Sequence, residues 1–221
     1  MLPAPALYAI GFAAQLFFSM RTLVQWVLSE RARKVLSPSW FWIFSLCGSW
    51  LLCIYGYLRS DFAIVLGQVV TYYIYLWNLR MKGVLGRVPM LVRIILFLTP
   101  VVAALLLLQN APMQVARFFR NADIPLALLL FGTAGQIIFT LRFVYQWLYS
   151  ARKGESALPA GFWIISILGA LVIVTYGIVR CDAVLIVGNG AGLVVYVRNL
   201  CIEQNNILLS DKRVGETKRK G

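Results

Sequence analysis

The feature of this sequence that most constrains its fold is an internal duplication. Residues near the N-terminus recur 121 positions later without a gap, as Gln15 and Gln136 do. Apolar composition alone would match leucine with isoleucine or valine, but it would not match arginine, glutamine and asparagine over such a length. The chain therefore contains two copies of one structural unit. The matched pairs include Arg21/Arg142, Gln25/Gln146, Trp26/Trp147, Ser29/Ser150, Ser45/Ser166, Gly48/Gly169, Tyr75/Tyr196 and Asn78/Asn199.

Long apolar runs predict that both copies lie in a membrane. Of the 221 residues, 61% are hydrophobic and 13% are charged, which is far more apolar than a soluble domain. About 20 apolar residues in a helix cross the hydrocarbon core of a bilayer, and backbone groups in lipid must be hydrogen-bonded internally, which favours helices. We expect an all-α integral membrane protein with seven transmembrane helices. They are placed at about 6–29, 37–58, 61–80, 88–108, 124–149, 158–179 and 182–201.

Each copy has three spans, and this odd number decides how the copies are related. A second copy joined directly would be inverted in the membrane, but the additional span restores its direction, so both repeats run parallel. Transporters are commonly built from such parallel halves, with a site at the repeat interface. The predicted organisation is a first repeat at 6–81, a linker helix at 88–108, an outer interfacial segment at 109–123, a second repeat at 124–201 and a basic tail at 202–221.

The distribution of lysine and arginine predicts the orientation. Thirteen of these residues fall in segments expected on one side of the membrane and four in segments expected on the other. Because cytoplasmic loops are enriched in Lys and Arg, we expect the N-terminus outside and the C-terminus in the cytoplasm. The formal net charge of +13 then reflects topology and attraction to anionic lipids, and no nucleic-acid partner is expected.

The residue types present disfavour catalysis and metal binding. The sequence has no histidine, and its four cysteines lack the Cys-x-x-Cys spacing of a zinc site. No nucleophile stands with a plausible base in the apolar spans. We therefore expect no metal, no cofactor and no enzymatic activity.

A polar face on the first span of each repeat points to an anion site. Helical periodicity places Gln15, Arg21 and Gln25 on one side of the first span, and Gln136, Arg142 and Gln146 do the same in the second repeat. Two guanidinium groups with amide donors, and no carboxylate in the middle of a span, are typical of phosphate recognition. Two alternatives stay open: Arg21 is roughly 12 Å from the cytoplasmic end and could snorkel there, and the amides could hydrogen-bond between helices.

The third span of each repeat adds further candidates for the binding site. Asn189 lies among glycines in "VGNGAGLVVYVRNL", where missing side chains leave room for a ligand, and Gln68 is its counterpart. The remaining candidate lining residues are Asn78, Asn199, Tyr75, Tyr196, Trp26 and Trp147.

The combined motifs resemble the lipid A biosynthesis N-terminal domain family. They are G-x-x-x-Q-x-x-F-x-x-R-x-x-x-Q-W, then P-x-x-F-W-x-x-S, Y-G, D and I-Y-x-x-N-L, and they cover roughly 11–80 and 132–201. This three-helix module is similar to PQ-loop, SWEET and semiSWEET transporters, and the arrangement of three, one and three spans resembles a SWEET. In that comparison Asn189 and Gln68 take the place of the pocket asparagine. The two halves are not equivalent, because Trp77 stands where the second repeat has Arg198.

The resemblance implies a bacterial inner membrane protein connected with lipid A or polyprenyl-phosphate sugars. Because it covers only the membrane module, it does not imply disaccharide synthase activity. Together with the cationic face, it predicts a transporter or flippase of an anionic, phosphate-bearing glycolipid. Two other functions remain open: a SWEET-like facilitator of small neutral sugars, and a non-transporting membrane partner of a glycosyltransferase.

Overall fold

The computed structural model describes residues 4–58, 62–108, 125–181 and 183–220, and in these ranges helices, joined by short loops, are the regular secondary structure. The predicted all-α class is therefore confirmed, and each predicted apolar run has its helix. The predicted interfacial segment at 109–123 lies outside the described residues. The elements are α1 (Ala4–Ala32), α2 (Ser39–Leu58), α3 (Phe62–Met81), the 3-10 turn η1 (Leu85–Arg87), α4 (Met90–Leu108), α6 (Leu126–Lys153), α7 (Ala160–Val179) and α8 (Ala183–Lys220).

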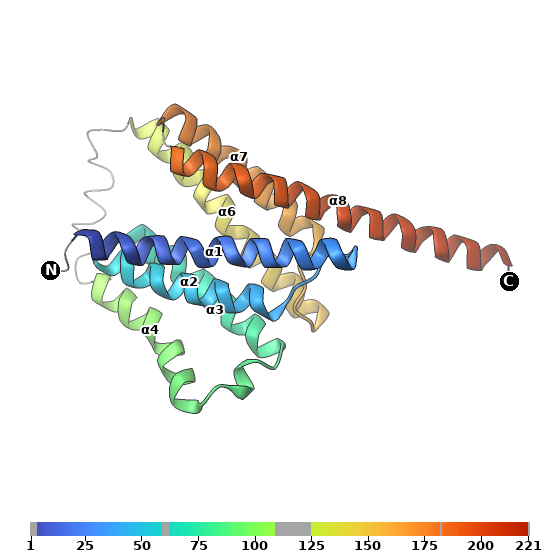
Figure 1. Ribbon diagram of the computed structural model, residues 1–221, viewed down its shortest axis with the longest axis horizontal. Coiled ribbons are helices and arrows are strands. Elements are labelled where there is room, and N and C mark those ends of the chain that lie inside the picture. The colour runs from blue at the N-terminus through green and yellow to red at the C-terminus, as the bar shows by residue number, and fades with distance from the viewer. Residues whose placement is uncertain (1–3, 59–61, 109–124, 182, 221) are drawn as a thin grey trace.

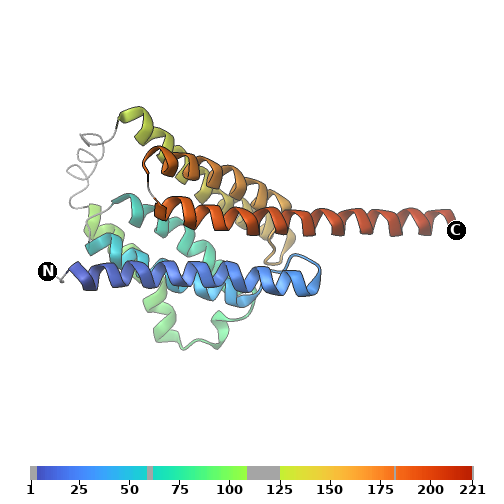
Figure 2. The same ribbon diagram turned by 45° about the horizontal axis from the view of Figure 1, so that its top comes forward.

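The helices form two three-helix groups that correspond to the two repeats. In the first group α2 packs against both α1 and α3, and in the second α7 packs against both α6 and α8. The groups meet along two seams, α1 with α8 and α3 with α6, while α4 lies against α2 and α3. α1 and α6 run in the same sense, and the two groups diverge toward the end that holds the N-terminus (Figures 1 and 2).

Helix ends follow local sequence. The residue after the end of α6 is Gly154, which has a φ of 73°, and α1 is followed at the matching position by Arg33, with a φ of 51°. A glycine at φ 70°, Gly83, follows α3. The second repeat has Gln204 at that position, and there α8 continues as helix to Lys220. Helices commonly end where glycine adopts the left-handed conformation, so loss of this glycine explains why the predicted basic tail extends α8.

Two matched glycines allow the first two helices of each repeat to approach closely. A Cβ atom on Gly48 of α2 would lie 2.9 Å from the ring of Phe18 on α1. A Cβ atom on Gly169 of α7 would lie 2.8 Å from the backbone nitrogen of Phe139 on α6. The absence of a side chain at these glycines therefore lets Phe18 and Phe139 lie directly beside α2 and α7, and both rings belong to the site described below.

Two of the described helices, α6 and α7, are long and apolar enough to cross a membrane. Shorter apolar stretches occur at Ser39–Tyr55 in α2 and Met90–Val102 in α4. The expected topology of seven spans goes further than this result and stays a prediction.

Candidate functional site

Arg21 lies buried on α1 inside a ring of polar and aromatic side chains. Its side chain is 8% exposed, and its Nη1 donates to Ser45 Oγ at 3.1 Å and to Tyr75 Oη at 3.2 Å. Its Cζ is 4.6 Å from the ring centroid of Phe18 and 5.5 Å from that of Phe41. The guanidinium group therefore has hydroxyl acceptors and aromatic faces around it.

Arg142 occupies the matching position on α6. It is 3% exposed, and its Cζ lies 3.4 Å from the ring centroid of Phe139, 5.6 Å from that of Phe162 and 5.5 Å from that of Tyr196. These three rings are the counterparts of Phe18, Phe41 and Tyr75 in the first repeat. The duplication therefore reproduces a whole aromatic cage around the guanidinium group.

One ring, that of Phe143, is shared by both cages. Its centroid lies 5.2 Å from Arg21 Cζ and 4.8 Å from Arg142 Cζ. The ring also packs edge-on against Tyr75 at a centroid distance of 5.1 Å and against Phe162 at 5.5 Å. Its counterpart in the first repeat is the much smaller Thr22, so the pseudo-symmetry is broken at the interface of the repeats.

A small cavity lies between the two arginines. Its volume is about 10 Å³, and Arg21, Arg142, Thr22 and Phe143 are among the residues that line it. A cavity of this size holds about one water molecule. The Nε atoms of both arginines are buried without a hydrogen-bond partner in the described part of the chain. The site thus offers N–H donors but is closed to anything much larger than water.

The charges of the two arginines are compensated without a carboxylate contact in the described residues. The ion pairs found there join Lys153 to Glu155 and Arg198 to Glu30, and neither involves Arg21 or Arg142. Each cation–π contact contributes about 0.5–2 kcal/mol, with the larger values at desolvated sites. The aromatic faces, together with the hydroxyl groups of Ser45 and Tyr75, therefore partly offset the cost of burying these positive charges.

Amide side chains join the two repeats on the loop side of the arginines. Gln25 Nε2 donates to Asn199 Oδ1 at 2.8 Å, and Asn199 Nδ2 donates back to Gln25 Oε1 at 3.1 Å. The second pair is formed in the same way by Gln146 and Asn78, at 2.9 and 3.1 Å. All four side chains are fully buried. For these four residues, which we call the inter-repeat amide pairs, the amides therefore hydrogen-bond between helices, as one of the two alternatives above expects.

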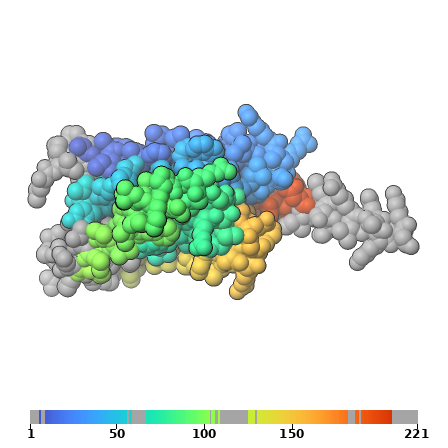
Figure 3. Space-filling view, turned by 90° about the horizontal axis from the view of Figure 1, so that it is seen from below, coloured from blue at the N-terminus to red at the C-terminus, as the bar shows by residue number. Residues whose placement is uncertain are grey.

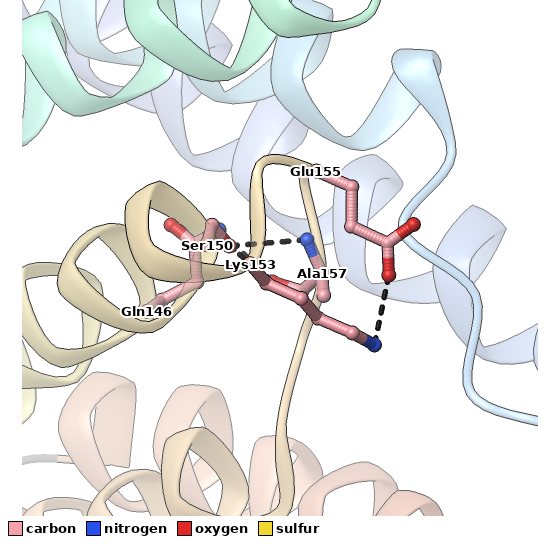
Figure 4. A network of polar contacts seen from close by, with 5 residues as sticks. All are labelled: Gln146, Ser150, Lys153, Glu155 and Ala157. Carbon is pink, nitrogen blue, oxygen red and sulfur yellow. Dashed lines mark hydrogen bonds and ion pairs between the residues drawn. The ribbon is translucent and has the colours of Figure 1, made fainter.

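The same glutamines also fix the loops that follow α1 and α6. Figure 4 shows Gln146 and Ser150 beside Ala157, whose backbone N–H donates to Ser150 Oγ at 3.1 Å. Gln146 Nε2 donates to the carbonyl oxygen of Ala157 at 2.9 Å. In the first repeat the backbone N–H of Leu36 donates to Ser29 Oγ at 3.0 Å. The spacing of glutamine and serine in the repeated motif therefore has a structural explanation.

The two seams between the repeats differ in charge. Arg198 Nε donates to Glu30 Oε2 at 2.9 Å across the α1–α8 seam, and a second bond joins the same two side chains. The hydrogen bond from Arg198 lowers the pKa of Glu30 below its usual value. At the matching positions of the α3–α6 seam the sequence has Trp77 and Ala151, which cannot form such a pair.

The other predicted site residues differ from the two arginines in exposure or in the partners they contact. Gln15 and Gln136 are exposed, and Trp147 is 37% exposed. Gln68 accepts a hydrogen bond from Ser49 Oγ at 2.8 Å, within its own repeat. Trp26 and Asn189 are half-buried. The structure thus brings together Arg21, Arg142, Tyr75 and Tyr196, and it engages the four inter-repeat amides beside them.

Sequence reasoning missed Phe143. The first repeat has threonine at that position, so the residue does not appear among the matched pairs. The available signal was the mismatch of Thr22 and Phe143 directly after the matched Arg21 and Arg142. A difference at that point of two otherwise similar helices indicates where the two repeats have different roles. The aromatic partners Phe41 and Phe162 were visible as a matched pair, but nothing in their spacing placed them against the guanidinium groups.

Comparison with known proteins gives the family. The model of the lipid A biosynthesis N-terminal domain matches residues 10–80 and again 131–201, which confirms the duplication. No solved structure matches the chain.

The chain also has relatives among curated proteins. It is 32% identical to a lipid-A-disaccharide synthase of Chlamydia pneumoniae over 199 residues, which cover 88% of this chain and 33% of the relative. A protein of the same name from Chlamydia abortus is 32% identical over 214 residues, with 93% of this chain and 34% of the relative covered. The chain therefore spans about one third of the length of these relatives. Since the two family matches together cover well over half of its residues, the chain belongs to the lipid A biosynthesis N-terminal domain family and carries two copies of that domain.

Proposed function

We propose that this protein is a multi-pass transporter or flippase that carries a phosphate-bearing glycolipid, such as a polyprenyl-phosphate sugar, across a bacterial inner membrane. The observation that carries the proposal is the pair of buried arginines at the repeat interface. Their Nε atoms are buried without a partner in the described residues. Guanidinium groups bind phosphate through charge-assisted hydrogen bonds, so an anionic head group is the ligand that best fits these donors.

The surface supports a location in a membrane. Figure 3 shows α4 across the centre of one face, where Met90 and Leu91 are 71% and 70% exposed. Further exposed apolar side chains lie on α6, among them Ile137 and Leu141. Large exposed apolar surfaces are rare in soluble monomers, so exposed apolar side chains on both helices favour a membrane environment. With the lysine and arginine bias, this favours seven spans, the N-terminus outside and the C-terminus in the cytoplasm.

The choice of a lipid-linked substrate comes from the family and its relatives. The curated relatives are named lipid-A-disaccharide synthases, and lipid A is itself a phosphorylated glycolipid. A carrier in that pathway would meet substrates that combine a sugar, a phosphate and an apolar tail. Such a tail can stay in the bilayer while the head group enters between the repeats.

Transport requires the site to open, because the cavity of about 10 Å³ is too small for a sugar phosphate. Opening toward the cytoplasm would separate the inter-repeat amide pairs, which close that side. No carboxylate or histidine contacts the arginines in the described residues, so we propose no proton relay. Movement would then follow the substrate gradient or its consumption by a later reaction.

The decisive experiment uses purified protein in liposomes with a fluorescent polyprenyl-phosphate sugar in both leaflets. We expect the double variant Arg21→Gln, Arg142→Gln to lose most of the flipping rate, because the head group loses both cationic partners. The matched control is Arg152→Gln, which removes one charge from the exposed end of α6 and should flip at the normal rate. A double variant as active as the original protein would refute the assignment.

A second candidate is a non-transporting membrane partner of a glycosyltransferase. It is favoured by the relatives, in which a region similar to this chain forms about one third of a longer synthase. It predicts no flipping by the unmodified protein in the same liposomes, together with binding of a glycosyltransferase that persists in the double variant. Facilitation of a neutral sugar has less support, because Gln68, which takes the place of the pocket asparagine in the first repeat, accepts a hydrogen bond from Ser49 Oγ within its own repeat.

A further inference from the structure

We propose that the ring of Phe143 occupies, in the ligand-free protein, the place where the anion contacts both arginines, so that this residue sets the affinity for the head group. The inference rests on the proposed function, since it concerns the same site. It adds a residue that the family motifs do not mark, and it explains how two buried positive charges persist while the site is empty.

The ring of Phe143 lies beside both guanidinium groups. Among the described residues, Phe143 is the side chain found within cation–π distance of both guanidinium groups, with its centroid 5.2 Å from Arg21 Cζ and 4.8 Å from Arg142 Cζ. It also lines the cavity between them. An anion that bridges both arginines must therefore come into the space beside this ring or displace it.

The cavity beside the ring is too small for a phosphoryl group. A volume of about 10 Å³ admits about one water molecule, whereas a phosphoryl group has a phosphorus atom and several oxygens. Thr22, the counterpart of Phe143, also lines the cavity, and its hydroxyl donates to the carbonyl oxygen of Phe18 at 3.1 Å. Of these two matched side chains that line the cavity, the ring of Phe143 is the bulkier.

The ring and a bound anion would compete for the same two guanidinium groups. Guanidinium bonds to phosphate are charge-assisted and stronger than cation–π contacts, so a bound anion would replace the contacts between Phe143 and the arginines. The affinity for the anion is nevertheless reduced, because binding gives up the stabilisation that the cation–π contacts of Phe143 supply to the ligand-free protein. Removing the aromatic face while keeping an apolar side chain of similar size should therefore tighten anion binding.

The test measures binding of inorganic phosphate to the purified full chain in detergent by isothermal titration calorimetry. We expect Phe143→Leu to bind phosphate about tenfold more tightly, equivalent to about 1.4 kcal/mol. Phe143→Tyr keeps the aromatic face and should bind within about threefold of the original protein. The matched control is Phe97→Leu, at an exposed ring on α4, which should leave binding unchanged. Equal or weaker binding by Phe143→Leu would overturn the inference.

A second measurement does not depend on the folding of the leucine variant. 4-Fluorophenylalanine introduced at position 143 reports on the ring by fluorine NMR, and the inference requires its resonance to shift as phosphate binds. A resonance that stays fixed at saturating phosphate contradicts the displacement. The two proposals fail separately: unchanged phosphate binding by Arg21→Gln, Arg142→Gln refutes the anion site itself, whereas loss of binding there with no effect of Phe143→Leu refutes only the role of the ring.

Discussion

Gln25 and Gln146 show how one side chain can serve two contacts. Each glutamine is fully buried; its amide nitrogen donates to the neighbouring serine and to an asparagine of the other repeat. Because a buried amide without partners is costly, the glutamine, the serine and the asparagine depend on one another. This dependence accounts for their joint recurrence in both copies without any contact to a ligand.

Removing one member of an inter-repeat amide pair should destabilise the fold. In Asn199→Ala the amide of Gln25 loses the partner that it meets at 2.8 and 3.1 Å. Leaving buried polar groups unpaired costs about 1–3 kcal/mol, so we expect a lower midpoint of thermal unfolding in detergent. The control Asn205→Ala changes an exposed asparagine further along α8 and should leave the midpoint unaltered. Equal midpoints for the two variants would show that the amide pair adds no stability.

At the scale of elements, the two repeats differ most clearly in how their helices end. Gly154 after α6 adopts its positive φ of 73° without strain, but the matching residue after α1 is Arg33, at 51°. A residue with a Cβ atom pays about 1–2 kcal/mol for the left-handed conformation. The end of α1 therefore carries a small strain that the end of α6 avoids.

Relieving that strain should stabilise the protein. We expect Arg33→Gly to raise the free energy of unfolding by about 1 kcal/mol, because glycine reaches a positive φ without steric cost. The control Arg31→Gly places glycine in the last turn of α1 and should instead destabilise by up to about 1 kcal/mol. Urea titration monitored by circular dichroism measures both. Destabilisation by Arg33→Gly would mean that the Arg33 side chain contributes more than its backbone costs.

At the scale of the whole molecule, the duplication predicted more than any single motif. The offset of 121 residues was enough to pair Arg21 with Arg142 and to predict two alike groups of helices. It was not enough to show that Gln25 meets Asn199, because contacts between repeats depend on how the groups dock and not on their internal spacing. The same reason hid Phe143, whose position matters only once both repeats are in place. Gln15 was placed on the arginine face by periodicity, yet its side chain is exposed, since one helix face is wider than the interface that covers it.

Two native cysteines offer a test of the topology of the whole molecule. Cys181 precedes α8 and Cys201 lies within it, and both are exposed. Twenty residues of helix span about 30 Å, which is about the thickness of the hydrocarbon core, so the two thiols should lie near opposite faces of the membrane. We expect a membrane-impermeant maleimide to label Cys181 in intact spheroplasts and Cys201 only after permeabilisation. Variants Cys181→Ser and Cys201→Ser assign each signal, and Cys53, which is buried, should stay unlabelled in both. Labelling of Cys201 but not Cys181 in intact spheroplasts would show that the orientation is opposite to the predicted one. Labelling of both before permeabilisation would rule out a membrane-spanning third helix in the second repeat.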